Sequence, residues 1–119
     1  MTGISLLRQV YSLLGRPERL AGGDGCEDGL LAVNQIYGEL WYRENSGEFV
    51  PLDSLGQTLE LSGRCLPALA YGTAMLLCLA ENEGPAYTRY AEQYRRAAAC
   101  AGGTPRSRLY VQPTEEVTA

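Results

Sequence analysis

The chain has 119 residues, 45% of them hydrophobic, and a formal net charge of −4. This length fits one domain with a modest core, and the apolar content excludes a disordered chain, while the acidic balance argues against a protein that binds duplex DNA by neutralising phosphates. Because the sequence contains neither His nor Lys, it lacks the usual general base, the commonest metal ligand and the lysine of a P-loop. We therefore predict no enzyme, no metal site and no cofactor.

The first predicted helix covers Ser5–Leu14, where apolar side chains recur at helical spacing and Gly15 and Pro17 follow. No basic region precedes an unbroken apolar run, so this segment does not resemble a secretory signal. The next stretch, Ala21–Gly29, is rich in glycine and acidic, which predicts a flexible loop. A phosphate-binding loop is excluded because no Lys and no preceding strand accompany these glycines.

The second predicted helix covers Gly29–Tyr42, with Asp28 as its N-cap. One face carries an apolar stripe made of Leu30, Val33, Tyr37, Leu40 and Trp41. A connector follows. It opens with a turn signal at Asn45–Gly47, and residues 49–52 fit either a short hairpin or an extended segment. The leucines from Leu52 to Leu61 have mixed spacing, which leaves their structure open.

The third predicted helix is the most apolar part of the chain. Only Gly72 and Thr73 interrupt the apolar run of Cys65–Ala80. A helix of this length spans roughly 24 Å, whereas crossing a bilayer takes about 20 residues. Since it is apolar on nearly every face, it is predicted to be the buried central helix of an all-α core and not a membrane segment.

The last predicted helix, Pro85–Ala101, follows after so short a link that it should form an antiparallel hairpin with the central helix. Its predicted inner face is made of tyrosines and alanines: Tyr87, Tyr90, Ala91, Tyr94, Ala97, Ala98 and Ala101. Gly102 and Gly103 end it. We expect one helical domain, residues 1–103, of about four helices with a long central loop, and an extended C-terminal arm, residues 104–119.

The arm carries the clearest sign of a binding function. Two arginines precede a short strand-prone centre that lies between prolines, and the candidate contact residues are Arg106, Arg108, Leu109, Tyr110 and Val111. This pattern is typical of an arm that adds a strand to a partner or enters a neighbour's groove. A disordered end is the alternative.

Two further kinds of chemistry are disfavoured. The four cysteines, Cys26, Cys65, Cys78 and Cys100, form no CxxC pair, and two of them on one helix would be too far apart for a disulfide, so free thiols are expected. Cys65 near a helix N-terminus could have a lowered pKa and serve a thiol enzyme, but a buried structural thiol is favoured. Arg95, Arg96 and the arm arginines could contact nucleic acid; nearby carboxylates favour a solvated face.

Four segments, in order, resemble the head-to-tail connector proteins of tailed bacteriophages. They are LAVNQIYGELWYREN (Leu31–Asn45), FVPLDSLGQTLEL (Phe49–Leu61), LPALAYGTAMLLCLAENEG (Leu66–Gly84) and YAEQYRRAAA (Tyr90–Ala99). The resemblance implies an all-α structural protein of the virion neck. Such a protein assembles as a ring, commonly of twelve copies, beneath the portal protein, extends the DNA channel and seats the next neck component, without sequence-specific DNA binding.

The acidic residues fit that expectation. Five carboxylates and two arginines lie between Leu30 and Arg64, and an acidic channel wall would repel the DNA backbone and let it slide. Glu44, Glu48 and Asp53 are the candidate channel-facing residues. The alternative function is that of a small all-helical regulatory domain that binds another protein as a monomer or dimer.

Overall fold

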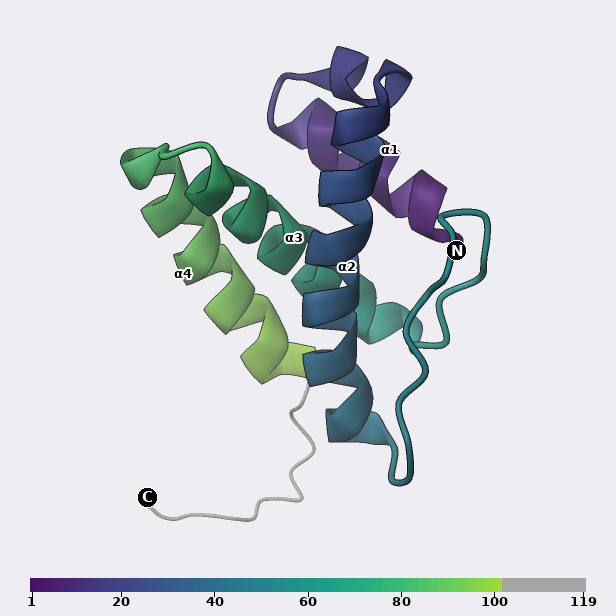
Figure 1. Ribbon diagram of the computed structural model, residues 1–119. Helices are drawn as coiled ribbons and strands as arrows, with labels where there is room; N and C mark the ends of the chain where they lie inside the picture. Colours follow the sequence, from purple (N-terminus) through teal and green to yellow (C-terminus); the bar gives the residue numbers. More distant parts are fainter. Residues whose placement is uncertain (102–119) are drawn as a thin grey trace.

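Four α-helices and two short 3-10 helices make up most of residues 1–101, which are the residues that the computed structural model describes (Figure 1). In chain order they are α1 (Gly3–Leu13), η1 (Pro17–Ala21), α2 (Gly23–Glu44), η2 (Gly63–Cys65), α3 (Leu66–Ala80) and α4 (Gly84–Ala101). Within these residues no strand forms. The predicted all-α class is therefore confirmed for the part of the chain described.

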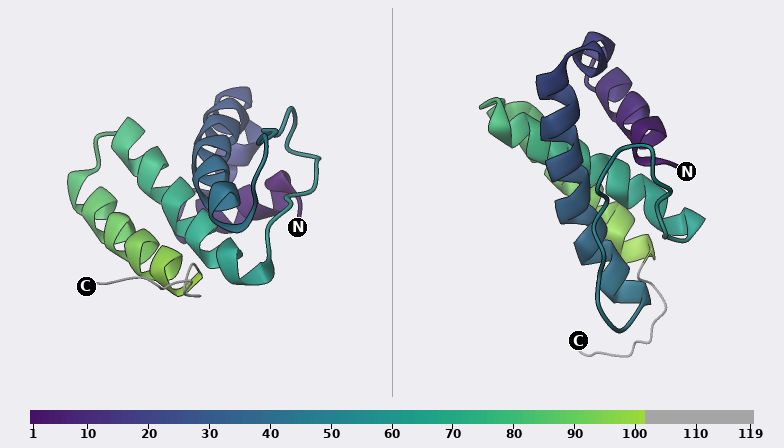
Figure 2. Two further views of the ribbon diagram at one scale, coloured as in Figure 1. Left: turned by 90° about the horizontal axis from the view of Figure 1, so that it is seen from below. Right: turned by 45° about the vertical axis from the view of Figure 1, so that its right-hand side comes forward.

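Helix α3 is the central element. Helix α4 runs antiparallel along one side of it, α1 packs against another side, and α2 crosses it (Figures 1 and 2). Seven of its residues are buried: Ala68, Leu69, Gly72, Thr73, Ala74, Leu77 and Cys78. Pro67 lies in the first turn, where its missing N–H costs no hydrogen bond. The predicted buried rod is thus confirmed, although Leu79 near its end is 55% exposed.

The turn between α3 and α4 is as tight as the sequence predicts. Asn82 adopts a left-handed backbone with φ 59°, and the Glu83 N–H donates to the Cys78 carbonyl at 3.0 Å, which satisfies a free carbonyl at the end of α3. Of the predicted inner face of α4, Tyr90, Ala98 and Ala101 are buried. Gly72 allows the close approach of three helices, because a Cβ there would lie 2.8 Å from Ile36 Cγ2 and 2.9 Å from Tyr94 Cδ1.

The predicted loop over Ala21–Gly29 is wrong, because α2 begins at Gly23. Asp28 is therefore inside the helix, and the N-cap is Gly22. The glycines serve close packing instead of flexibility: a Cβ on Gly25 would lie 2.0 Å from the Arg19 carbonyl oxygen, and one on Gly29 would lie 2.4 Å from Leu7 Cδ1. The helix gains this contact at a cost of about 1 kcal/mol per glycine in propensity.

Residues 45–62 connect α2 to η2 without a helix or strand, so no hairpin forms over residues 49–52. Leu52 and Leu59 of this connector are buried in the core. Its backbone also caps α1. The Gly3 N–H donates to the Gln57 carbonyl at 3.1 Å and the Ile4 N–H to the Leu55 carbonyl at 2.8 Å, which satisfies donors that a helix N-terminus leaves free.

Polar side chains hold the elements in register. The Asn34 amide of α2 donates to the Leu52 carbonyl at 3.0 Å and accepts from the Leu52 N–H at 2.8 Å. The Tyr37 hydroxyl accepts from the Glu60 N–H at 2.9 Å. The Tyr90 hydroxyl of α4 donates to the Leu13 carbonyl of α1 at 3.3 Å. The bundle is thus joined by hydrogen bonds as well as by its apolar core.

Candidate interaction surfaces

Glu44, the first candidate channel acid, lies at the end of α2 and is bound within the protein. Its carboxylate accepts from the Ser62 N–H and hydroxyl, and Arg64 Nε lies 3.7 Å away. Partial burial by itself would raise the pKa of Glu44, but the Ser62 hydrogen bonds and Arg64 outweigh it, so this pKa lies below its ordinary value. Glu44 therefore links the end of α2 to the start of η2.

Glu48 and Asp53, the other two candidates, are exposed on the connector. Glu48 borders a shallow hollow of about 180 Å³ that also contacts Trp41, Val50 and Glu60. Val50 is 74% exposed, so the connector presents acidic and apolar groups side by side. Glu44 is thus bound by neighbouring side chains, whereas Glu48 and Asp53 are exposed, although all three belong to one acidic stretch of sequence.

The five arm residues, Arg106, Arg108, Leu109, Tyr110 and Val111, lie outside the described residues. The described chain ends with α4, whose carboxyl end is held by α2: Arg43 Nη1 donates to the Ala98 carbonyl at 3.1 Å. This contact fixes the point from which the arm departs. Sequence reasoning assigned no role to Arg43, and its partner lies 55 residues away.

Cys65 does not have the environment of a nucleophile. It caps α3 and is 2% exposed, and burial raises the pKa of its thiol. The lowered pKa considered from the sequence is therefore wrong. Cys65 and Cys78 are both buried and unbridged, which agrees with structural thiols. Among residues 1–101 there is also no group of three or more side chains that could hold a metal ion.

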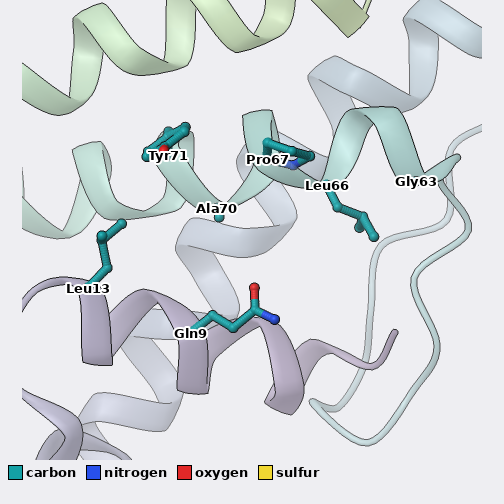
Figure 3. A pocket seen from close by; sticks show the side chains of 7 residues that line it. All are labelled: Gln9, Leu13, Gly63, Leu66, Pro67, Ala70 and Tyr71. Carbon is teal, nitrogen blue, oxygen red and sulfur yellow. The ribbon is translucent and has the colours of Figure 1, made fainter.

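A cavity of about 440 Å³ opens between α1 and α3 (Figure 3). Gln9 and Leu13 line it from α1, whereas Leu66, Pro67 and Tyr71 line it from α3. Leu13 is 47% exposed at its edge. The lining is mostly apolar and holds no ionisable carboxyl or guanidinium group, so it suits an apolar side chain of a partner better than a charged metabolite.

A second groove, of about 300 Å³, lies between α2 and α3. Its prominent residues are Leu31 of α2, which is 71% exposed, and Leu79 of α3. Sequence reasoning missed both. The position of Leu31 beside the apolar stripe of α2 could have indicated an exposed apolar side chain. Leu79 gives no such indication, because it does not differ from its neighbours in a uniformly apolar run.

The arginines of α4 are solvated, as the sequence favours. Arg95 and Arg96 both pair with Glu92 within one helical turn and remain about 70% exposed. Such exposed pairs contribute little to stability. Tyr94 is different, because its hydroxyl donates to Glu39 Oε1 at 2.7 Å; burial and this carboxylate raise the pKa of Tyr94 well above its ordinary value.

Among residues 1–101, one helical window, Gly63–Ala80, has the length and composition to cross a membrane, with a mean hydropathy of 1.3. Of this window 44% is buried inside the bundle, and the core helix of a globular protein passes the same test. Packing against α1, α2 and α4 accounts for the apolar side chains on its buried faces.

Comparison of the sequence with protein-family models and with curated proteins, and of the fold with solved structures, finds no match.

Proposed function

We propose that this protein is a structural subunit of the head-to-tail connector of a tailed bacteriophage. In this proposal copies of the chain form a ring, commonly of twelve, under the portal protein, and the downstream neck protein binds the opposite side. DNA passes through the ring without sequence-specific contacts. The protein is made in the host cytoplasm and resides in the neck of the virion, and it catalyses no reaction.

The observation that carries the proposal is the position of the four resembling segments in the fold. They fall on the second part of α2, the loop of residues 45–62, α3 with the turn after it, and the middle of α4. Residues within them make the contacts between these elements: Asn34 binds Leu52, Tyr37 binds Glu60, and Gly72 contacts Ile36 and Tyr94. Because these side chains determine how the elements pack, a resemblance at those positions supports a shared fold more strongly than similar composition would.

Glu48 and Asp53 are the acids that we assign to the channel wall. Both are exposed, whereas Glu44 is held by Ser62 and Arg64. An exposed carboxylate near the path of the genome repels phosphates and reduces friction along the channel. Glu44 then supports the wall from inside the subunit and does not face the DNA.

Co-expression with the portal protein from the same genome tests the proposal. We expect the two proteins to co-purify and a ring to be visible on the portal by negative-stain electron microscopy. As a matched control, the same tag is placed on an unrelated helical protein of similar size. A chain that remains a monomer or dimer and does not bind the portal would contradict the proposal.

The channel assignment has a separate test. The double change Glu48→Lys with Asp53→Lys should slow genome ejection without altering ring assembly, because it reverses charge on the wall only. Glu18→Lys is the matched control, since Glu18 is exposed on η1 away from the connector. Wild-type ejection by the double variant would rule out channel positions for these two residues.

The alternative, a small regulatory domain that binds one protein, is favoured by one observation, the apolar cavity between α1 and α3. In that case Leu13→Glu should abolish binding of the partner, and the chain should act as a monomer or dimer. A subunit of a phage head-to-tail connector should instead form a large ring, so the size of the particle distinguishes the two functions.

A further inference from the structure

The groove between α2 and α3 exposes apolar side chains near the end of α3. Leu31 and Leu79 are 71% and 55% exposed and line the same groove, together with Leu76 and Ala80. Leu79 also lines a smaller hollow of about 180 Å³ beside Tyr87 at the turn into α4. Two exposed leucines that line one hollow indicate a binding site for an apolar segment of a partner.

The rim of this groove is acidic. Asp28 lines the groove itself, with its side chain 54% exposed, and Glu83 borders the adjoining hollow. Arg16 pairs with Glu81 and Glu83, and Arg19 pairs with Glu81 and lies 3.9 Å from Asp28. Asp24 and Glu27 are exposed in the first turns of α2, so residues 24–28 and 81–83 together carry five carboxylates beside these two arginines. The groove therefore favours an apolar segment that is flanked by positive charge.

The chain contains one such segment. Arg106 and Arg108 directly precede Leu109, Tyr110 and Val111. The apolar side chains match the leucine-lined hollow, and the arginines match the carboxylates on its rim. Outside the α-helices, no other part of the sequence has two arginines close to three consecutive apolar residues.

Chain length favours binding to a second copy. Helix α4 carries the chain away from the groove, because it runs antiparallel to α3 and its last turn lies at the end of the hairpin opposite the α3–α4 turn (Figure 2). Leu79 is thirteen residues after Leu66 in α3, a distance of about 20 Å along the axis. The seven residues 102–108 reach at most about 25 Å. Binding to its own groove would therefore need a nearly straight arm running back across the hairpin.

We propose that residues Arg106–Val111 of one copy bind the groove between α2 and α3 of a second copy, head to tail. The proposal rests on the proposed function in naming the contact that joins neighbouring subunits of the ring. A head-to-tail contact uses two different surfaces of each subunit, so it can continue from copy to copy until the ring closes.

Two variants of the full chain test it by size-exclusion chromatography with light scattering. The arm variant carries Arg106→Glu and Arg108→Glu, and the groove variant carries Leu79→Glu, an exposed position that should not disturb the core. Circular dichroism verifies that both stay helical. We expect the wild type to form oligomers and each variant alone to be monomeric. Leu13→Glu is the matched control, an exposed leucine outside the groove, and should assemble normally.

Mixing the two variants gives the decisive result. The intact arm of the groove variant should bind the intact groove of the arm variant, and the chain of contacts should stop there, which predicts a one-to-one dimer and no larger species. A mixture that stays monomeric would overturn the proposal, as would a wild type that is monomeric at every concentration or a groove variant that still assembles. Loss of assembly in Leu13→Glu alone would move the binding site to the α1–α3 cavity and overturn it too.

The outcome is separable from that of the proposed function. If the variants behave as expected but the protein ignores the portal, the contact between copies stands and the connector function fails. If the portal is bound while the arm variant still assembles like the wild type, the connector function stands and this contact fails. Loss of portal binding in an arm variant that self-assembles would assign the arm to the portal and overturn the contact between copies.

Discussion

Replacing Asn34 with alanine should destabilise the protein by releasing the connector from α2. The Asn34 amide makes both hydrogen bonds of the Leu52 backbone, at 2.8 and 3.0 Å, and Leu52 is only 6% exposed. Each bond contributes about 1 kcal/mol net, and leaving a buried group unpaired costs about 1–3 kcal/mol. Because Asn34 itself is half-buried and water can reach part of the site, we expect a loss of about 2–3 kcal/mol in the free energy of unfolding.

Urea unfolding measures this loss, with helicity followed by circular dichroism and the connector by the fluorescence of Trp41, the only tryptophan. Trp41 reports on the connector because its ring lies 5.8 Å from that of Phe49. Gln35→Ala, at an exposed position on the same turn, is the matched control and should shift stability by no more than about 0.5 kcal/mol. A folded Asn34→Ala variant within that same margin of the wild type would refute the reasoning.

Asn34→Asp sharpens the test through pH. A carboxylate can still accept from the Leu52 N–H, but it faces the Leu52 carbonyl without a proton to donate. The folded state therefore favours the neutral acid and raises the pKa of the new carboxyl above its unfolded value of about 3.9. The loss of stability of Asn34→Asp relative to the wild type should therefore be largest near neutral pH and should shrink as the pH falls toward 4. A deficit that does not depend on pH would contradict the assigned donor.

Three further predictions concern the core and Glu44. Gly72→Ala should lower the free energy of unfolding by about 1–3 kcal/mol, because the new Cβ would meet Ile36 and Tyr94. Gly63→Ala, where no atom lies within 4 Å of the added Cβ, is its control in the same denaturation assay. Thr73→Val should leave stability unchanged or raise it by about 1 kcal/mol, because the Thr73 hydroxyl is fully buried without a hydrogen-bond partner among the described residues; a loss of stability in thermal unfolding would show that the hydroxyl has a partner. Glu44→Gln should lower the free energy of unfolding by about 1–2 kcal/mol at neutral pH. Because the folded pKa of Glu44 is lowered, this difference from the wild type should begin to shrink below the unfolded pKa of about 4.3 and vanish below the folded pKa, as acid titrations of stability would show.

Periodic apolar patterns predicted most of the helices. The starts or ends of α1, α3 and α4 agree with the sequence within two residues, because apolar spacing and the glycines and prolines around it are local signals. The start of α2 could not be predicted in this way. Gly25 and Gly29 normally weaken a helix, and what outweighs that cost is contact with Arg19 and Leu7, which no local rule sees.

The candidate sites show the same limit. Counting charges placed Glu44 with Glu48 and Asp53, but Glu44 has its partner at Ser62, eighteen residues further along the chain. The exposure of Leu79 could not be predicted either, since a helix that is apolar all round gives no indication of which side remains uncovered. Composition, in contrast, is independent of the fold: the lack of His and Lys restricts the available chemistry whatever the packing.

The capping of α1 by residues 55–57 has a consequence for the order of folding. The bonds from Gly3 to Gln57 and from Ile4 to Leu55 close loops of more than fifty residues, whereas α3 and α4 meet across a turn of a few residues. Closing a long loop costs more conformational entropy than closing a short one, and contacts between distant residues therefore form more slowly. An isolated helix of eleven residues, such as α1, is only marginally stable in water. We therefore expect amide protons at the start of α1 to gain protection later in folding than those of the α3–α4 hairpin, which pulsed hydrogen exchange would measure.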